Sequence, residues 1–335
     1  MWLWIPTVIF VILLACRIYY RGQSGVCRST RRLDGKTAIV TGSSSGIGKE
    51  TARDLAKRGA RVILACRNVQ KAQRVADDII NTTGNSNVVV KKVDTSDLSS
   101  VRNFAKEIID TEKALHILVN NAGILGPDKK EFTKDGLELT MATNHFGHFL
   151  LTNMLLGLLK SSAPSRVVTV SSLAHKWVKS DLDDINYERQ AYDGSLNVYA
   201  QTKLCNVLFT VELADRLRGT GVTANCAHPG VVTTQIASNK KDRFNIRKIL
   251  FHPLIYIFKG EELGAQTTNF LAVAEDVEHV SGEYFVDCQI AATSLIAKDR
   301  AVARKLWDES ERLVNLTSED LEYKGNTENQ EDIEQ

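Results

Sequence analysis

The sequence predicts an α/β protein built on a doubly wound parallel sheet, with helices covering both faces. Two observations support this fold class. Short runs of β-branched residues alternate with helix-length segments of mixed polarity through most of the 335 residues, and the first run leads directly into the glycine-rich stretch TGSSSGIGKE. Such alternation implies right-handed crossovers between parallel strands. The composition, 43% hydrophobic and 24% charged, is sufficient for one globular domain with a substantial core.

Seven runs are predicted as strands, because each is short, rich in β-branched residues and bounded by polar or glycine-containing segments. In chain order they are TAIV from Thr37, RVILA from Arg61, VVVKKV from Val88, HILVN from His116, RVVTVSS from Arg166, VTANCAHP from Val222 and GEYFVD from Gly282. The segments between them are long enough for the helices that connect parallel strands.

Charge and cysteine content exclude several classes of function. The formal net charge is +2 and no stripe of Lys and Arg is interleaved with aromatic residues, so we expect no nucleic-acid partner. The six cysteines lie far apart, without a C-x-x-C pair or a histidine cluster at metal-ligand spacing. The sequence therefore predicts no metal site, and free thiols in a reducing compartment.

The amino-terminal run WLWIPTVIFVILLACRIYY carries a single charge, Arg17. As a helix its 19 residues would span about 28 Å, close to the ~27 Å hydrocarbon core of the endoplasmic reticulum membrane. A transmembrane anchor is predicted over residues 1–21, followed by a basic linker over 22–36. A cleaved signal peptide is the alternative, but no Lys or Arg precedes the run and no A-x-A site follows it. The stretch LLAC at 13–16 would resemble a lipoprotein cleavage box in a bacterial source.

The flanking charges predict the orientation of this anchor. No basic residue precedes the apolar run, whereas Arg17 lies near its end and five more follow it: Arg21, Arg28, Arg31, Arg32 and Lys36. The positive-inside rule then places the domain in the cytosol, on a single-pass protein of the endoplasmic reticulum. Glycan on the acceptor sites Asn81 or Asn315 would contradict this orientation. The acidic residues 317–335 are expected to form a disordered tail.

The glycine-rich stretch lies on the turn from the first strand into the first helix. Gly42, Gly46 and Gly48 allow a tight turn, close backbone approach to a ligand and close helix packing. A helix N-terminus at this place attracts phosphate groups. We therefore expect a dinucleotide pyrophosphate here, although a glycine-rich turn on its own is often no more than a turn.

A second pattern carries acid–base chemistry. Tyr199 and Lys203 are four residues apart, so a helix would present both on one face. A neighbouring cation is expected to lower the pKa of the Tyr199 phenol and make it a usable general acid or base. Ser172, at the end of the fifth strand, is expected to bind the same substrate oxygen. Each residue alone is common without function, and only the combination indicates catalysis.

Residues at the end of the second strand indicate which cofactor is used. A carboxylate there usually binds the ribose 2′-hydroxyl of NAD, whereas this chain has Arg67, together with Lys49 in the phosphate loop. Two cations suit the 2′-phosphate of NADP(H). The alternative is that Arg67 is only solvated.

Six ordered motifs between Val40 and Val286 resemble those of the short-chain dehydrogenase/reductase family. After the glycine-rich loop come VDTSD with Asp94, NNAG from Asn120, ATNHFGHF with Asn144, VSS ending in Ser172, YAQTK from Tyr199 and HPGVVTT from His228. Longer stretches, such as GIGKETARDLAKRGARVILACRN and APSRVVTVSSLAHK, together with the apolar amino terminus, resemble the microsomal retinol dehydrogenases, which are NADP-dependent retinal reductases.

This resemblance implies a Rossmann fold over residues 37–316 and several residue roles. Lys203 would also hold the nicotinamide ribose, and Asn144 would support a water that connects Lys203 to solvent. Asp94 and Asn121 would lie near the adenine and its ribose. The remaining cofactor-binding positions implied are Ser44, Ser45, Ile47, Pro229 and Thr233.

The substrate side departs slightly from this branch, at Thr169 and in the length of the segment between Ser172 and Tyr199. A basic stretch over 240–248 precedes the apolar run ILFHPLIYIF over 249–258, which predicts either a membrane-facing lid for a lipophilic carbonyl compound or a core helix with a solvated flank. The predicted activity is NADP(H)-dependent interconversion of retinol and retinal, with retinal reduction favoured. Reduction of steroids or lipid aldehydes, and an idle NADPH-sensing protein, are the alternatives. A homodimer is left open.

Overall fold

The computed structural model describes residues 22–178, 182–192, 194–232 and 259–322, with the isolated positions 8, 11 and 15. Its centre is one sheet with the strand order β3-β2-β1-β4-β5-β6-β7-β8. Every neighbouring pair from β3 to β7 is parallel, and only β8 runs antiparallel. The strands are β1 Thr37–Thr41, β2 Arg61–Cys66, β3 Val88–Lys92, β4 Ile117–Asn120, β5 Ser165–Val170, β6 Val222–His228, β7 Tyr284–Val286 and β8 Gln289–Ile290.

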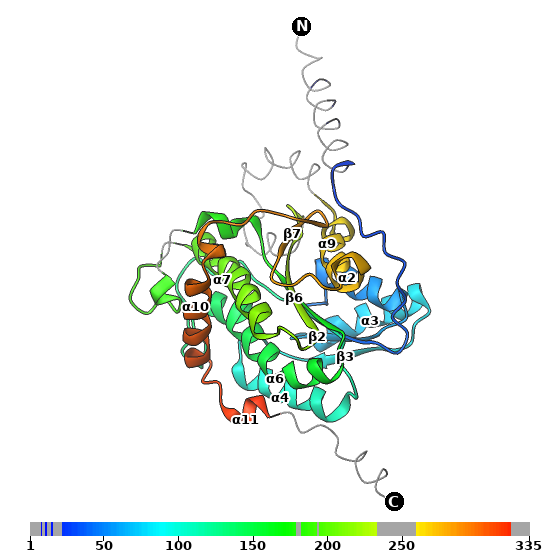
Figure 1. Ribbon diagram of the computed structural model, residues 1–335, viewed down its shortest axis with the longest axis horizontal. Helices are drawn as coiled ribbons and strands as arrows, with labels where there is room; N and C mark the ends of the chain where they lie inside the picture. Colours follow the sequence, from blue (N-terminus) through cyan, green and yellow to red (C-terminus); the bar gives the residue numbers. More distant parts are fainter. Residues whose placement is uncertain are drawn as a thin grey trace, which may run out of the picture.

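Helices cover both faces of this sheet (Figure 1). One face packs against α2 Gly46–Lys57, α3 Val69–Thr83 and α9 Glu261–Val273. The other packs against α4 Leu98–Thr111, α6 Gly147–Ser161 and α7 Ser195–Arg216, with α10 Arg300–Leu313 lying on α7. Shorter elements are α5 Leu139–Met141, η1 Ala142–Phe146, η2 Leu173–Trp177, η3 Leu182–Asp184, η5 Glu275–Val277, η6 Ile296–Lys298 and α11 Ser318–Leu321.

The predicted doubly wound sheet is confirmed, and all seven predicted runs form strands. The central strands are continuous apolar runs because both of their sides are covered; all residues of β1 are buried. The two-residue strand β8 was not predicted. It pairs with β7 as Phe285↔Ile290 and Val286↔Gln289 after a turn in which Asp287 and Cys288 both adopt positive φ.

Several predictions concern residues outside the described part of the chain. The anchor over 1–21, apart from Val8, Val11 and Ala15, lies there, as do the apolar run 249–258 and Thr233. Within the described residues, no helix combines the length and apolar character needed to cross a bilayer. Five cysteines are described, and all of them are free thiols.

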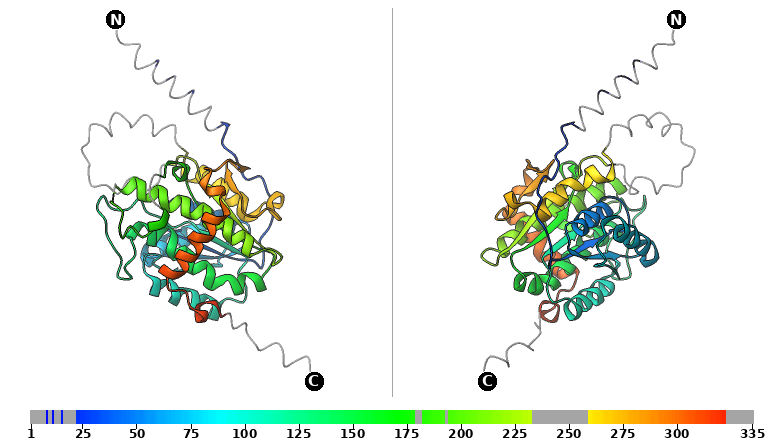
Figure 2. Two further views of the ribbon diagram at one scale, coloured as in Figure 1. Left: turned by 60° about the vertical axis from the view of Figure 1, so that its left-hand side comes forward. Right: turned by 90° about the vertical axis from the view of Figure 1, so that its right-hand side faces the viewer.

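The described part of the basic linker runs along one side of the domain (Figure 2). The Gly25 amide donates to Asp287 Oδ1 at 3.2 Å, and the Cys27 amide donates to Gln266 Oε1 at 3.1 Å. A Cβ on Gly25 would lie 1.9 Å from the Asp287 carbonyl oxygen, so only glycine fits this contact. The linker is therefore packed onto α9 and the β7–β8 turn.

The predicted disordered tail begins later than expected. Residues 318–321 form α11, which starts with a capping box between Thr317 and Asp320. Asp320 is 5% exposed and accepts hydrogen bonds from Arg102 Nε and Nη2 at 3.0 and 2.9 Å. An acidic composition therefore did not prevent order here, because Arg102 on α4 provides a partner for the buried carboxylate.

Replacing Asp320 with Asn should destabilise the protein by about 2 kcal/mol, because the Arg102 guanidinium would lose a charged, largely buried partner. Burial raises the pKa of Asp320, but the hydrogen bonds from Arg102 and Thr317 outweigh this and hold it below its ordinary value. The difference between wild type and Asp320→Asn should consequently shrink as the pH falls below about 4. Chemical denaturation measures both. Glu319→Gln, on the exposed side of α11, is the matched control and should change stability little; an equal loss in both variants would contradict the role of Asp320.

Candidate active site

The glycine-rich stretch forms the predicted turn between β1 and α2. Gly42 and Gly46 have φ of 67° and 62°, backbone conformations that residues with a side chain adopt only with strain. A Cβ on Gly42 would also lie 2.8 Å from the backbone of Ala122, which follows β4. The turn therefore depends on glycine both for its conformation and for its contact with the neighbouring strand end.

Gly48 allows α2 to pack closely against its neighbours. A Cβ at this position would lie 2.4 Å from Asn121 Nδ2 and 2.8 Å from the Gly42 carbonyl oxygen. Asn121 Nδ2 donates to the Thr41 carbonyl at 2.8 Å. The absence of a side chain at Gly48 thus makes room for Asn121, which joins the carboxyl ends of β1 and β4.

A cavity of about 640 Å³ lies at this edge of the sheet. Nine residues predicted to bind the cofactor line it: Gly42, Ser44, Ser45, Gly46, Ile47, Gly48, Arg67, Asp94 and Asn121. Ser45 is the N-cap of α2, and its side chain makes no capping hydrogen bond. The first amides of α2 are consequently available to a phosphate, and the residues present fit a dinucleotide.

Of the two cations predicted to bind the 2′-phosphate, only Arg67 lines the cavity. Arg67 lines the cavity, with Nη1 3.8 Å from Asp94 Oδ2 and 73% of its side chain exposed. Lys49 does not line it, and its ammonium lies 3.2 Å from Asp78 on α3. Lys71 of α3 lines the cavity instead. The expectation for Lys49 overlooked the acidic residue that draws its side chain away from the loop.

The predicted catalytic pair lies together on α7, with Lys203 Nζ 5.4 Å from the centre of the Tyr199 ring. Lys203 is 4% exposed and donates to the Val170 carbonyl at 3.1 Å. A Cβ on Gly123, a cavity residue, would lie 3.7 Å from Lys203 Nζ and 3.3 Å from Asn144 Oδ1. Lys203 and Asn144 therefore border the cavity behind Gly123.

The pKa of Tyr199 differs from the expectation. Burial raises the pKa of its phenol, and the Ser172 hydroxyl opposes this increase. Burial also lowers the pKa of Lys203, to about 8. Lys203 therefore does not lower the pKa of Tyr199 as expected. Both groups are buried, and burial disfavours the charged form of each.

Asn144 lies in η1, a single π-helical turn that interrupts the helix formed with α6. Its side chain accepts from the Ile124 amide at 2.8 Å and donates to Thr202 on α7 at 3.1 Å. Single π-helical turns within helices are frequent at functional sites. This one holds Asn144 between the segment after β4 and α7.

A buried histidine links this turn to β1. His148 Nε2 is 2.9 Å from Thr41 Oγ1, and His148 Nδ1 is 3.2 Å from the Asn144 carbonyl oxygen. Thr41 Oγ1 also accepts the amides of Asn121 and Ala122, at 2.9 and 3.0 Å. Burial lowers the pKa of His148 to about 4, so the ring stays neutral and its Nδ1–H donates to the carbonyl.

The remaining predicted residues follow the carboxyl ends of β5 and β6. Ser172 comes directly before η2, and its hydroxyl accepts the Ala174 amide at 3.2 Å. Pro229 follows β6 and is partly buried. Thr233 is outside the described residues.

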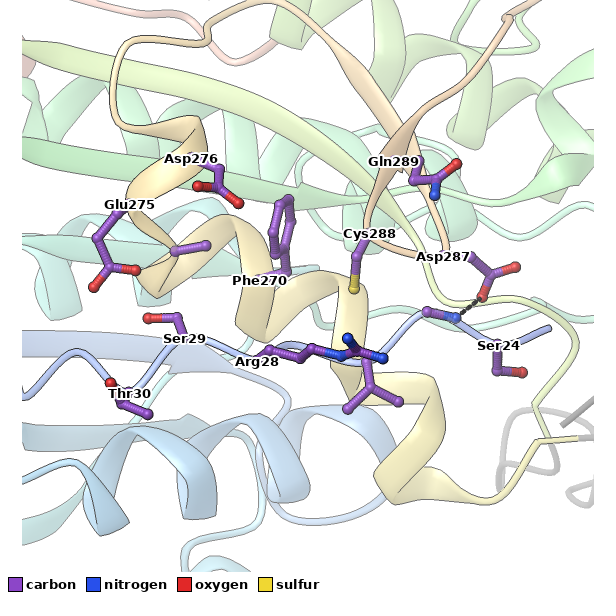
Figure 3. A pocket seen from close by; sticks show the side chains of 13 residues that line it. Ser24, Arg28, Ser29, Thr30, Phe270, Glu275, Asp276, Asp287, Cys288 and Gln289 are labelled. Carbon is purple, nitrogen blue, oxygen red and sulfur yellow. Dashed lines mark hydrogen bonds between the residues drawn. The ribbon is translucent and has the colours of Figure 1, made fainter. Parts of the chain in front are cut away.

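A second cavity, of about 740 Å³, lies between the linker, α9 and the β7–β8 turn (Figure 3). Its lining includes Arg28, Glu275, Asp276 and Cys288, and none of the predicted site residues. Of the two cavities, only the one at the glycine-rich loop is lined by predicted site residues within the described part of the chain.

The chain is similar to proteins of one family. The model of a family described as short chain dehydrogenase matches residues 36–181. Human retinol dehydrogenase 11 is 46% identical over 295 residues, which cover 88% of this chain and 90% of that protein. This chain belongs to the short-chain dehydrogenase family, in its retinol dehydrogenase branch. Mouse retinol dehydrogenase 13 is 45% identical over 87% of each chain.

Solved structures of short-chain dehydrogenases and similar proteins share the fold. An uncharacterized protein from Mycobacterium paratuberculosis is 34% identical, with a TM-score of 0.68, over 87% of this chain and 98% of that chain. Levodione reductase has a TM-score of 0.61 at 20% identity, over 76% of this chain and 96% of that chain.

Sequence reasoning missed Thr41, His148 and Lys71 as residues of this short-chain dehydrogenase site. The spacing of His148 four residues after Asn144 in ATNHFGHF is a signal that it lies on the same helix face. No comparable signal marks Thr41, since its partners come from β4 and α6.

Replacing Thr41 with Val should destabilise the protein by about 2 kcal/mol or more, because it leaves two amides and His148 Nε2 without their partner. Chemical denaturation measures this loss. Thr37→Val is the matched control on the same strand, since the Thr37 hydroxyl makes no hydrogen bond within the described part of the chain. Equal stability of Thr41→Val and wild type would show that the Thr41 hydroxyl does not hold these elements together.

Proposed function

We propose that this protein is an NADP(H)-dependent oxidoreductase that interconverts retinol and retinal, with reduction of retinal favoured. The observation that carries the proposal is the clustering of four side chains, in which Tyr199 contacts Ser172 and Lys203, and Lys203 and Asn144 lie beside Gly123 of the cavity at the glycine-rich loop. The names of the retinol dehydrogenases that it resembles support the substrate class.

The bound cofactor would supply the hydride, and the protein would supply the proton. Because burial raises the pKa of Tyr199, its phenol is protonated near neutral pH and is able to donate to the oxygen of a carbonyl substrate as negative charge develops there. Ser172 would donate a hydrogen bond to the same oxygen. Lys203, still cationic below about pH 8, would stabilise the phenolate that remains.

The proton would be replaced from solvent along Lys203 and a water held by Asn144. The π-helical turn and the His148 hydrogen bond fix the Asn144 backbone beside the segment after β4. Lys203 would also hold the nicotinamide ribose. Support for these roles comes from the burial of both side chains next to Gly123.

The preference for NADP(H) rests on Arg67 and Lys71. Both line the outer part of the cavity beyond the end of β2, where an NAD-dependent enzyme places a carboxylate. Asp94 also lines this part and lies 3.8 Å from Arg67 Nη1, so the guanidinium is kept beside the cavity. A 2′-phosphate would meet two cations there.

Arg67→Ala should weaken NADPH binding by about tenfold or more and leave NADH binding nearly unchanged, because only NADPH carries the 2′-phosphate. Titration of cofactor fluorescence measures both affinities. Arg74→Ala, which removes an exposed cation of α3 that does not line the cavity, is the matched control. Equal weakening of NADPH and NADH by Arg67→Ala would contradict the assignment.

A single-pass anchor over residues 1–21, with the domain on the cytosolic side of the endoplasmic reticulum, belongs to this proposal. It would keep the enzyme where a poorly soluble retinoid partitions. The apolar run 2–20 and the basic residues that follow it support this placement.

The experiment that tests the function is NADPH consumption with all-trans-retinal by the full-length, membrane-bound protein. Tyr199→Phe should lower turnover by about 10² or more while NADPH affinity stays within about twofold, because only the proton donor is removed. If wild type binds NADPH but leaves retinal unreduced, the retinoid assignment fails, and steroids and lipid aldehydes become the substrates to test. Undiminished turnover by Tyr199→Phe would instead refute the catalytic assignment.

A further inference from the structure

His175 lies in η2, three residues after Ser172, and is 1% exposed. Both of its donors point to one acceptor. The His175 amide lies 3.2 Å from the Ser172 carbonyl oxygen, and His175 Nδ1 lies 2.7 Å from the same oxygen. Because a carbonyl oxygen only accepts hydrogen bonds, Nδ1 must carry the proton in this contact.

The other side of the imidazole is enclosed as well. Its Nε2 accepts the Ser294 amide at 3.4 Å, and its ring packs edge-on against Tyr284 of β7 at a centroid distance of 4.8 Å. Burial lowers the pKa of His175, which keeps the ring neutral and agrees with an unprotonated Nε2. The imidazole is therefore held in one tautomer and one orientation by β7 and the segment before η6.

These contacts bear directly on the Ser172 hydroxyl. The backbone of Ser172 is extended, with φ of −154° and ψ of 159°, and its hydroxyl caps η2 by accepting the Ala174 amide. The oxygen of this hydroxyl is thus oriented by the backbone of η2, while its proton is left to donate. The Ser172 carbonyl belongs to the peptide that leads into η2, so holding it also holds η2, whose Ala174 amide orients the hydroxyl.

We propose that His175 is a positioning residue for the reaction, which holds the Ser172 carbonyl and thereby fixes the Ser172 hydroxyl beside Tyr199. The proposal rests on the function proposed above, because Ser172 matters to the rate only if it binds the reacting oxygen. His175 itself does not touch the substrate in this assignment. Its action passes through the single hydrogen bond from Nδ1.

Replacing His175 with Asn or Gln distinguishes this positioning role from simple packing. The amide nitrogen of Asn reproduces the position of His Nδ1, whereas that of Gln reproduces Nε2. His175→Asn should therefore retain kcat within about threefold, while His175→Gln should lower it by about tenfold or more, since small displacements of a reacting group are costly. KM for the carbonyl substrate and the affinity for NADPH should change little in both variants.

Equal kcat values in the Asn and Gln variants, whether both are high or both are low, would overturn the proposal. Thermal unfolding of both variants should show whether a low value reflects loss of folding. If wild type reduces another carbonyl compound in place of retinal, the same comparison applies to that compound. The failure of the retinoid assignment is therefore distinguishable from the failure of the role of His175.

A second measurement is independent of activity. The imidazole ¹⁵N spectrum of the wild-type protein should show a neutral His175 ring protonated on Nδ1, assigned by its disappearance in His175→Asn. A ring protonated on Nε2 would leave the Ser172 carbonyl without this donor and would refute the proposal whatever the kcat values of the two variants.

Discussion

The hydroxyl of Thr41 is the contact on which the arrangement of this site depends. It stands at the carboxyl end of β1, accepts two amides from the segment after β4 and bonds to His148 of α6. His148 in turn holds the carbonyl of Asn144. One buried oxygen therefore sets the relative positions of the phosphate loop, the NNAG segment and the π-helical turn. Since buried polar groups are costly when unpaired, these elements are constrained to move together.

The glycines of the phosphate loop have different tasks within this arrangement. Gly42 and Gly46 provide backbone conformations that other residues avoid, and Gly48 leaves room for the Asn121 side chain. Asn121 then bonds to the Thr41 carbonyl. The glycines that indicate cofactor binding are thus also required for packing, because the carboxyl ends of β1 and β4 must approach each other closely before a cofactor is bound.

The fold was predictable because its strands and helices are encoded locally. Strands buried on both faces appear as short apolar runs, and they alternate with helix-length segments of mixed polarity. The candidate site was predictable where residues act through a short spacing, as Tyr199 and Lys203 do. It was not predictable where a distant partner decides the outcome. Asp78 draws Lys49 out of the loop, Arg102 orders the start of an acidic tail, and burial raises the pKa of Tyr199 although a lysine lies next to it. Such effects depend on contacts that only the folded chain creates.

The pair formed by Arg102 and Asp320 joins residues separated by 218 positions in the chain. Arg102 also binds the carbonyl oxygens of Val314 and Asn315, so the face of the domain that carries α4 is closed by almost the last described residues. During synthesis this face stays open until the carboxyl-terminal segment has left the ribosome. Domains generally fold as units as the chain emerges, so completion of this one waits for the segment that carries Asp320. A chain shortened before α11 would keep the carbonyl partners of Arg102 but leave its guanidinium without the Asp320 carboxylate.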